Sequence, residues 1–279
     1  MDMTGAMGTR LYLDLLKRTL TRSAFPDRFH RFRRSALRRN PLASLFYPVV
    51  EKTLDAFNLA LCRTRFDPGK RMEGRDWPAE AETMIGMKRL DNLEQCIRSV
   101  LERDVPGDFI ETGVWRGGSC ILMRAVLKAF GDDNRIVWAA DSFEGIPSPD
   151  PRYPLDGGST FHEYSDILGV SLEQVQENFR RYGMLDDQVR FLKGLFKDTL
   201  PTAPIRELAI LRLDGDLYSS TIDALTSLYP KLSPGGFVIV DDYGDLLGCR
   251  QAVTDYREKH GICEPIVKID WTGVFWEKR

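Results

Sequence analysis

Short apolar runs alternate with amphipathic segments along most of the chain after residue 100. The apolar runs have strand length and cover residues 108–114, 136–143, 189–196, 208–214 and 237–241. Segments with helical periodicity lie between most of them, at residues 119–130, 172–182 and 221–228. Strands that alternate with helices are typical of a mostly parallel sheet with both faces covered. The pattern therefore predicts an α/β fold.

The C-terminal end of the chain departs from this alternation. A helical segment at residues 251–260 is followed by two strand-like runs, at 266–270 and 274–277, separated by residues 271–273. A connection of this length joins the two strands of a hairpin. We expect a mostly parallel seven-stranded sheet that ends in an antiparallel hairpin, an arrangement associated with the Rossmann-like class I methyltransferase fold.

The N-terminal region has a different pattern. The predicted units are residues 1–75, a helical extension or lid, and residues 76–279, a domain with this methyltransferase-like fold. Within the extension, apolar residues at 11–20 and at 46–61 predict two helices, and the sequence at 67–70 predicts a turn or linker. A longer helix is expected to start at Pro78, because proline and acidic residues favour the first helical turn.

Composition and charge narrow the classes of function. The 279-residue chain has a formal net charge of −2, so the whole protein offers no electrostatic basis for binding nucleic acid. Seven arginines from Arg22 to Arg39 form either a solvated helix face or a contact for an acidic partner, an anionic substrate or a membrane surface. The five cysteines lack CxxC spacing, which favours reduced thiols in a cytoplasmic protein. Residues 42–61 are too charged to cross a bilayer, and membrane contact is not expected.

Two acidic clusters stand directly after apolar runs. The first is Asp214-Gly215-Asp216, and the second is Asp241-Asp242. The carboxyl ends of parallel strands meet at one edge of a sheet, where ligands bind. Two unit charges about 4 Å apart repel by roughly 4 kcal/mol at an effective dielectric constant of ~20. The clusters therefore predict a bound divalent cation, which takes oxygen ligands.

A glycine-rich turn follows the first strand and leads into a helix. The residues of this turn expected to bind a cofactor are Glu111, Gly113, Gly117, Gly118 and Ser119. Glycines allow a sharp turn and the close approach of a ligand. A helix N-terminus adds free N–H groups that favour a carboxylate or phosphate. The alternative interpretation is a tight connection between strand and helix.

Asp141 and Ser142 end the second strand, where an acidic residue suits the two hydroxyls of a ribose. NAD and S-adenosylmethionine both carry a ribose. However, the GxxxGG spacing of the turn differs from the GxGxxG of dinucleotide sites. Glu111 would also repel a pyrophosphate but tolerate the cationic amino-acid end of S-adenosylmethionine. A methyl donor is therefore preferred over a dinucleotide.

Several further motifs occur in the order found in one family. They cover residues 83–92, 106–118, 140–145, 196–201, 213–218, 232–236, 240–243 and 273–276. With these motifs the chain resembles the macrocin O-methyltransferase (TylF-type) family, which methylates deoxysugar hydroxyls of antibiotics. The resemblance extends from about residue 77 to the C-terminus and, weakly, over residues 11–18. Residues 22–75 depart from the family pattern, so the acceptor is left open.

The resemblance implies Mg²⁺- and S-adenosylmethionine-dependent methylation of a small-molecule glycoside by a homodimer. The metal ligands that it implies are Asp214, Asp241 and Asp242, and the general base is Asp216. The cofactor residues that it implies are Glu111, Gly113, Asp141 and Ser142.

Three alternatives remain open. A methyltransferase of catechols or other aromatic diols would use the same two-oxygen chelation. A non-catalytic or membrane-associated glycan-binding protein would use residues 28–61 as a basic and apolar interfacial patch. Asp216 has an alternative role of its own, as a cap of the following helix in competition with Ser219 and Ser220.

Overall fold

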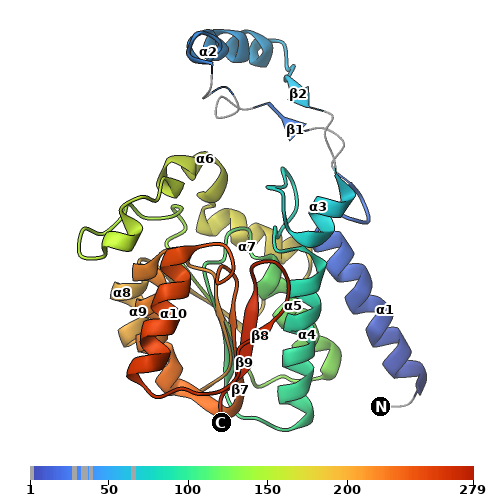
Figure 1. Cartoon of the computed structure of the whole chain (residues 1–279). Helices are drawn as coiled ribbons and strands as arrows, with labels where there is room; N and C mark the ends of the chain where they lie inside the picture. Colours follow the sequence, from blue (N-terminus) through green and yellow to red (C-terminus); the bar gives the residue numbers. More distant parts are fainter. Residues whose placement is uncertain (1–2, 27–29, 33–36, 38–39, 64–66) are drawn as a thin grey trace.

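The centre of the molecule is a seven-stranded sheet with the strand order β5-β4-β3-β6-β7-β9-β8 (Figure 1). The structure, a computed structural model, describes residues 3–26, 30–32, 37, 40–63 and 67–279. The strands are β3 (Asp108–Thr112), β4 (Val137–Asp141), β5 (Val189–Lys193), β6 (Leu208–Leu213), β7 (Leu232–Val240), β8 (Val267–Lys268) and β9 (Val274–Glu277). The first five strands pair in parallel, and β9 pairs antiparallel with both β7 and β8. The predicted α/β fold with an antiparallel C-terminal hairpin is confirmed.

Helices cover both faces of the sheet (Figure 1). They include α4 (Gly86–Glu102), α5 (Gly118–Phe130), α7 (Leu172–Arg181), α8 (Phe196–Thr199), α9 (Tyr218–Leu228) and α10 (Leu247–Lys259). Successive side chains of each strand enter different cores. Phe109 belongs to the core that includes residues of α4, α5 and α7, whereas Ile110 belongs to the core that includes residues of α9 and α10. Burial on both faces accounts for the continuous apolar runs of the sequence.

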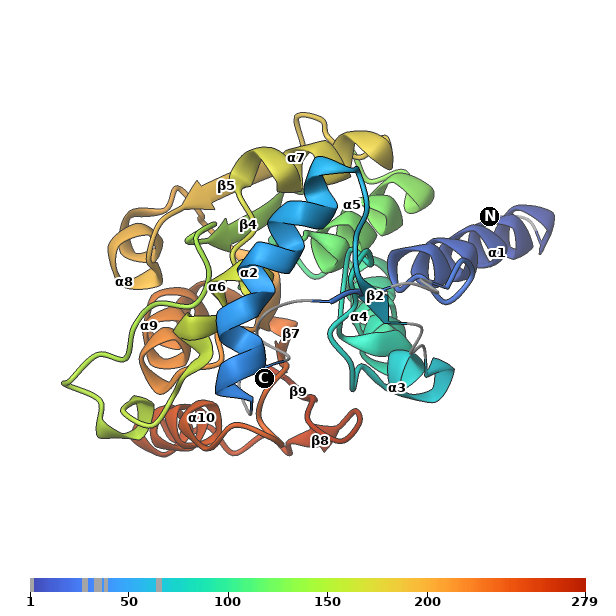
Figure 2. The same ribbon diagram turned by 90° about the horizontal axis from the view of Figure 1, so that it is seen from above.

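The N-terminal region contains two parts that behave differently. Helix α1 (Met3–Leu20) buries Leu13, Leu16 and Leu20 in the same core as α4 and α5, as its apolar spacing predicts. Helix α2 (Pro41–Ala56) forms, with β1 (His30–Arg31) and β2 (Cys62–Arg63), an arm that extends beyond the sheet (Figure 1). Seen from above, α2 crosses over the carboxyl edge of the sheet (Figure 2).

Several predictions from the sequence concern the N-terminal region that contains this arm. Most of the arginine run between Arg22 and Arg39 lies outside the described residues. Helix α2 begins before the predicted position because Pro41 occupies its first turn and the side chain of Asn40 accepts a hydrogen bond from the Ala43 N–H at 3.2 Å. Among the described residues, no helix is long and apolar enough to cross a membrane. The division of the chain at residue 75 stays a prediction.

The predicted turn at residues 67–70 is wrong, because helix α3 (Pro68–Glu73) begins there. The side chain of Asp67 accepts hydrogen bonds from the N–H groups of Gly69 and Lys70, at 3.0 and 3.1 Å. Proline at the first position and the left-handed Gly74 at the end complete the helix signals.

The predicted helix start at Pro78 is also wrong, because α4 begins at Gly86. The N–H groups of Glu82 and Thr83 bond to the carbonyl of Leu20, and the carbonyl of Glu82 accepts from the Gly118 N–H at 3.0 Å. These tertiary bonds override the local helix signal and hold residues 78–85 between α1 and the glycine turn. Helix α10 begins at Leu247, before the predicted start at residue 251.

Candidate active site

A cavity of about 460 Å³ lies at the carboxyl edge of the sheet. The ends of β3, β4, β6 and β7 contribute to its lining, so the acidic clusters and the glycine turn meet there. The predicted site residues that line it are Glu111, Gly113, Ser119, Asp141, Ser142, Asp214, Asp216, Asp241 and Asp242. Gly117 and Gly118 are not among its lining residues in the described part of the chain.

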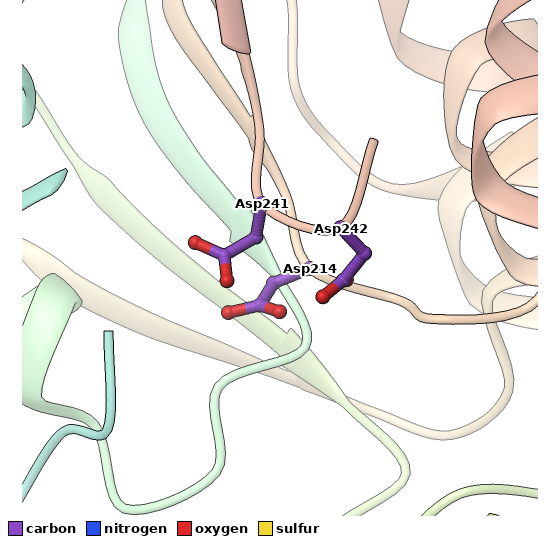
Figure 3. A group of neighbouring side chains, drawn as sticks. All are labelled: Asp214, Asp241 and Asp242. Atoms are coloured by element: carbon purple, nitrogen blue, oxygen red, sulfur yellow. The ribbon is translucent and has the colours of Figure 1, made fainter. Parts of the chain in front are cut away.

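Three carboxylates converge at one point of this cavity. One oxygen from each of Asp214, Asp241 and Asp242 lies within 4.8 Å of the others (Figure 3). The sheet fixes two of them through the backbone, because the Asp214 N–H bonds to the β3 carbonyl of Thr112 and the Asp241 N–H to the β6 carbonyl of Leu213. The topology of the parallel sheet thus brings the two acidic clusters together.

Arg212 lies beneath the carboxylates and is only 1% exposed. Its Nη1 donates to Glu111 Oε1 at 2.6 Å and to Asp214 Oδ2 at 2.7 Å, and its Nη2 donates to Asp241 Oδ1. This guanidinium compensates part of the negative charge of the site. The sequence analysis missed it, although a charged residue inside the apolar run of β6 was a visible signal.

Arg89 of α4 is a second buried guanidinium at the site. Its Nη1 donates to Asp241 Oδ2, and its Nε donates to Asp270 Oδ2 at 3.0 Å. Asp241 is therefore held by two arginines, one on each oxygen. Removing one partner of such a buried ion pair strongly destabilises the fold, because the other charge stays buried without a partner.

Asp242 differs from the other two carboxylates of the cluster. Its Oδ2 is buried and has no hydrogen-bond partner among the residues that the structure describes. Burial raises the pKa of the Asp242 carboxyl well above its usual range, and the charges of Asp216 and Asp214 raise it further. A buried oxygen without a partner is costly, so this oxygen fits a cation ligand.

Asp216 follows Gly215 in the turn between β6 and α9. It adopts φ 59°, in the left-handed region that aspartate tolerates better than most residues. No hydrogen bond reaches its carboxylate from the described residues, and burial raises its pKa, with further contributions from Asp214 and Asp241. The helix-capping alternative for Asp216 is wrong, because the carboxylate of Asp156 accepts from the first N–H groups of α9.

Each glycine of the turn after β3 is required for a different structural reason. Gly113 has φ +94°, and a Cβ there would lie 1.7 Å from the carbonyl oxygen of Asp214. A Cβ on Gly117 (φ +90°) would lie 3.0 Å from the ring of Phe179, and a Cβ on Gly118 would clash with the backbone of Glu82. Gly113 thus brings the glycine turn and the acidic turn together, whereas Gly117 and Gly118 are needed for packing outside the cavity.

Glu111 lies inside the predicted cofactor site but already has partners. Besides Arg212, its Oε2 accepts from the Cys120 thiol at 2.9 Å. Burial raises the pKa of Glu111 to about 7, although the charge of Arg212 opposes the rise. Its carboxylate therefore belongs to a charge network that reaches the acidic cluster.

Asp141 is surrounded by donors from the protein. Its Oδ2 accepts from the N–H groups of Val114 and Trp115 at 2.6 and 3.3 Å, and its Oδ1 accepts from the Phe143 N–H at 2.8 Å. A longer bond of 3.3 Å comes from Ser142 Oγ. A carboxylate has about four acceptor sites. Asp141 thus holds the glycine turn in place in this structure.

Known proteins resemble the chain along nearly its whole length. Residues 9–278 match the family described as macrocin-O-methyltransferase (TylF). The 8-demethyl-8-(2,3-dimethoxy-alpha-L-rhamnosyl)-tetracenomycin-C 4'-O-methyltransferase of Streptomyces olivaceus is 53% identical over 267 residues, 95% of this chain and 92% of that protein. The mycinamicin III 3''-O-methyltransferase of Micromonospora griseorubida is 48% identical over 279 residues and covers 99% of both chains.

A solved structure gives the same result for the fold. The O-methyltransferase NovP superimposes with a TM-score of 0.82 and 47% sequence identity, and the match covers 97% of this chain and 99% of that one. Family, relatives and fold therefore agree with the resemblance that the motifs indicate. The predicted departure of residues 22–75 from the family is wrong, because the family match extends from residue 9 to residue 278. The chain belongs to the macrocin O-methyltransferase (TylF) family and is an O-methyltransferase.

Proposed function

We propose that this enzyme uses S-adenosylmethionine and Mg²⁺ to methylate a sugar hydroxyl of a glycosylated antibiotic. The observation that carries the proposal is the buried, unpartnered oxygen of Asp242 beside Asp214 and Asp241, in the same cavity as the Gly113 turn. The acceptor class rests on the relatives, one of which is named for a rhamnosyl tetracenomycin.

The three carboxylates suit Mg²⁺, which takes oxygen ligands from carboxylates. Asp214, Asp241 and Asp242 would hold the ion, and Arg89 and Arg212 would keep Asp241 oriented through their bonds to its two oxygens. When bound, Mg²⁺ lowers the pKa of a hydroxyl that it coordinates and fixes that hydroxyl in place.

The remaining residues would align the reactants and move the proton. Asp216, whose carboxylate faces no competing donor among the described residues, would accept the proton of the acceptor hydroxyl. Glu111 and the Gly113 turn would hold the amino-acid end of the methyl donor. A ribose hydroxyl at Asp141 would replace the long bond from Ser142 Oγ. Alignment of the hydroxyl oxygen with the methyl carbon is the main requirement of this reaction.

A homodimer is a further part of the proposal. Leu45, Phe46 and Val49 of α2 are each more than 60% exposed, and contiguous apolar surface of this kind is commonly covered by a protein partner. Light scattering at several concentrations tests this point, with a mass of 31.9 kDa expected for a monomer.

Product formation with two acceptors tests the function. The enzyme is given S-adenosylmethionine, Mg²⁺ and either a deoxysugar glycoside of a polyketide or a catechol, and S-adenosylhomocysteine release is measured. We expect turnover with the glycoside, loss of turnover in EDTA, and recovery when excess Mg²⁺ is added. Faster turnover with catechol would favour the aromatic-diol alternative, and full activity in EDTA would contradict the metal requirement.

A further inference from the structure

Asp156 is a buried carboxylate with no part in the function proposed above. It is 1% exposed and lies in the segment of residues 145–170, between β4 and α7. Its Oδ1 accepts from the Tyr218 N–H at 2.7 Å, and its Oδ2 accepts from the Ser219 N–H at 3.0 Å. Both oxygens of one side chain are therefore bonded to the start of α9.

Helix α9 depends on this carboxylate for its N-terminal cap. The residue at its own capping position is Leu217, whose side chain cannot accept a hydrogen bond. The first N–H groups of a helix need acceptors, and a negative charge there interacts favourably with the helix dipole. Asp156 supplies both from a position 62 residues away from Tyr218 in the sequence.

The surroundings of Asp156 are shaped for this bond. A Cβ on Gly248, at the start of α10, would lie 3.2 Å from Asp156 Oδ1 and 3.1 Å from the Tyr218 nitrogen. The ring of Tyr153, in the same segment as Asp156, lies 5.3 Å from that of Tyr218. The yellow-green segment that carries Asp156 reaches α9 and α10 in both views (Figures 1 and 2).

The bond joins two walls of the active-site cavity. On one side, the segment 145–170 lines the cavity with Ile146, Pro147, Phe161 and Leu168. On the other side, Asp216 also lines it and stands two residues before Tyr218. Because Asp156 fixes the first N–H groups of α9, it also fixes the end of the short turn that carries Asp216.

Two other contacts anchor the same segment elsewhere. The Nε1 of Trp115, in the glycine turn, donates to the carbonyl of Ile167 at 2.9 Å. The rings of Trp77 and Tyr164 meet edge to face, with centroids 5.2 Å apart. These contacts connect the segment to the glycine turn and to the rim of the cavity, whereas Asp156 connects it to the turn of Asp216.

We propose that Asp156 is a positioning residue that acts through Asp216, by capping α9 and so holding the Asp216 carboxylate in its reactive position. This inference rests on the proposed role of Asp216 as the general base. A misplacement of a catalytic group by about 1 Å costs on the order of 100-fold in rate. Loss of the cap therefore lowers kcat and leaves the affinity for S-adenosylhomocysteine unchanged.

The test is a double-mutant cycle with Asp156→Asn and Asp216→Asn, in which kcat and KM are measured. Asp156→Asn lowers kcat by about 10- to 100-fold, with KM for S-adenosylmethionine nearly constant. In the Asp216→Asn background the same change has almost no further effect on kcat, because the group that it positions is already lost. Asp150→Asn is the matched control in the same segment, because Asp150 pairs with Arg152 at the surface.

Other outcomes separate the two proposals. Wild-type kcat in Asp156→Asn overturns the positioning role, and so does a further loss of equal size in the Asp216→Asn background. Wild-type kcat in Asp216→Asn overturns the base instead, and with it a role of Asp156 that acts through Asp216. If Asp156→Asn does not fold, Gly248→Ala tests the same bond with the carboxylate retained. Unchanged kcat in that variant, together with faster hydrogen exchange at the Tyr218 and Ser219 N–H groups, also contradicts the role.

Discussion

The acidic residues of the active site divide into two groups that differ in what holds them. On the glycine-turn side, Glu111 is bonded to Arg212 and Cys120, and Asp141 is bonded to four donors of the surrounding chain. On the acidic-cluster side, Asp242 has a buried oxygen without a partner in the described residues, and no donor there reaches Asp216.

This difference separates acids that the protein already holds from acids whose acceptor positions are still open. A carboxylate that the protein already bonds stabilises a turn or a charge network, and a ligand that binds there has to share or replace those bonds. A buried carboxylate with unfilled acceptor positions lowers the stability of the fold unless a ligand occupies those positions. Asp241 lies between these extremes, because two arginines hold it while it also faces the cluster. It is therefore a poor choice for testing metal binding alone.

The largest expected effect comes from the unpartnered carboxylate. Asp242→Asn removes the negative charge of a proposed cation ligand without breaking an ion pair, and we expect kcat to fall about 1,000-fold or more. S-adenosylhomocysteine affinity, measured by calorimetry, stays at the wild-type value. Asp133→Asn, at an exposed position outside the cavity lining, is the control with the same chemical change. Wild-type activity of Asp242→Asn in EDTA would contradict the metal site.

The second-largest effect is expected on stability, when the buried guanidinium that links acids of both groups is removed. Arg212→Met keeps an unbranched side chain but leaves Glu111, Asp214 and Asp241 without their common guanidinium. Breaking such a buried network lowers the free energy of unfolding by about 3–5 kcal/mol. Urea unfolding measures this loss. Arg103→Met, which breaks the exposed pair with Glu277, costs about 1 kcal/mol or less, and an equal loss in both variants would contradict the network.

A third prediction concerns pH and the buried Glu111. Its pKa is raised from 4.5 to about 7 in the folded protein, chiefly by burial. A raised pKa stabilises the fold below the unfolded value of 4.5, and this contribution is lost as the pH rises through about 7. Relative to Glu111→Gln, the wild-type free energy of unfolding should fall by on the order of 3 kcal/mol over that window. If the free energy of unfolding depends on pH in the same way in both proteins, Glu111 does not cause the loss of stability.

The smallest effect is expected at the proposed base. Asp216→Asn should reduce kcat about 100-fold, since general-base catalysis contributes that order of rate. Binding of Mg²⁺ and of S-adenosylhomocysteine, both measured by calorimetry, should stay close to wild type. A wild-type rate would mean that another group takes the proton and that Asp216, although unpartnered, serves a different purpose.

Much of the fold could be predicted from the sequence, because the patterns that indicate it lie within short stretches of the chain. The apolar runs of the strands and the short connection between the last two strands each predict structure within a short window. The meeting of Asp214 with Asp241 was also predictable, because it follows from parallel strands alone.

The missed features depend on contacts between distant parts of the chain. Arg89 and Asp241 are 152 residues apart, and no local pattern indicates which buried carboxylate an arginine will hold. Residues 78–85 carry a helix signal that bonds to Leu20 and Gly118 override. Asp156 could not be recognised as a cap because it lies far from the helix that it caps.

Gly113 has a consequence for changing the acceptor by directed evolution. Any side chain at this position would collide with the backbone of Asp214, so the two turns form one unit that random substitution will break rather than tune. Libraries aimed at new antibiotics should therefore leave both turns unchanged. Diversity belongs in the segments around Trp77 and Phe161, which line the cavity from outside the sheet.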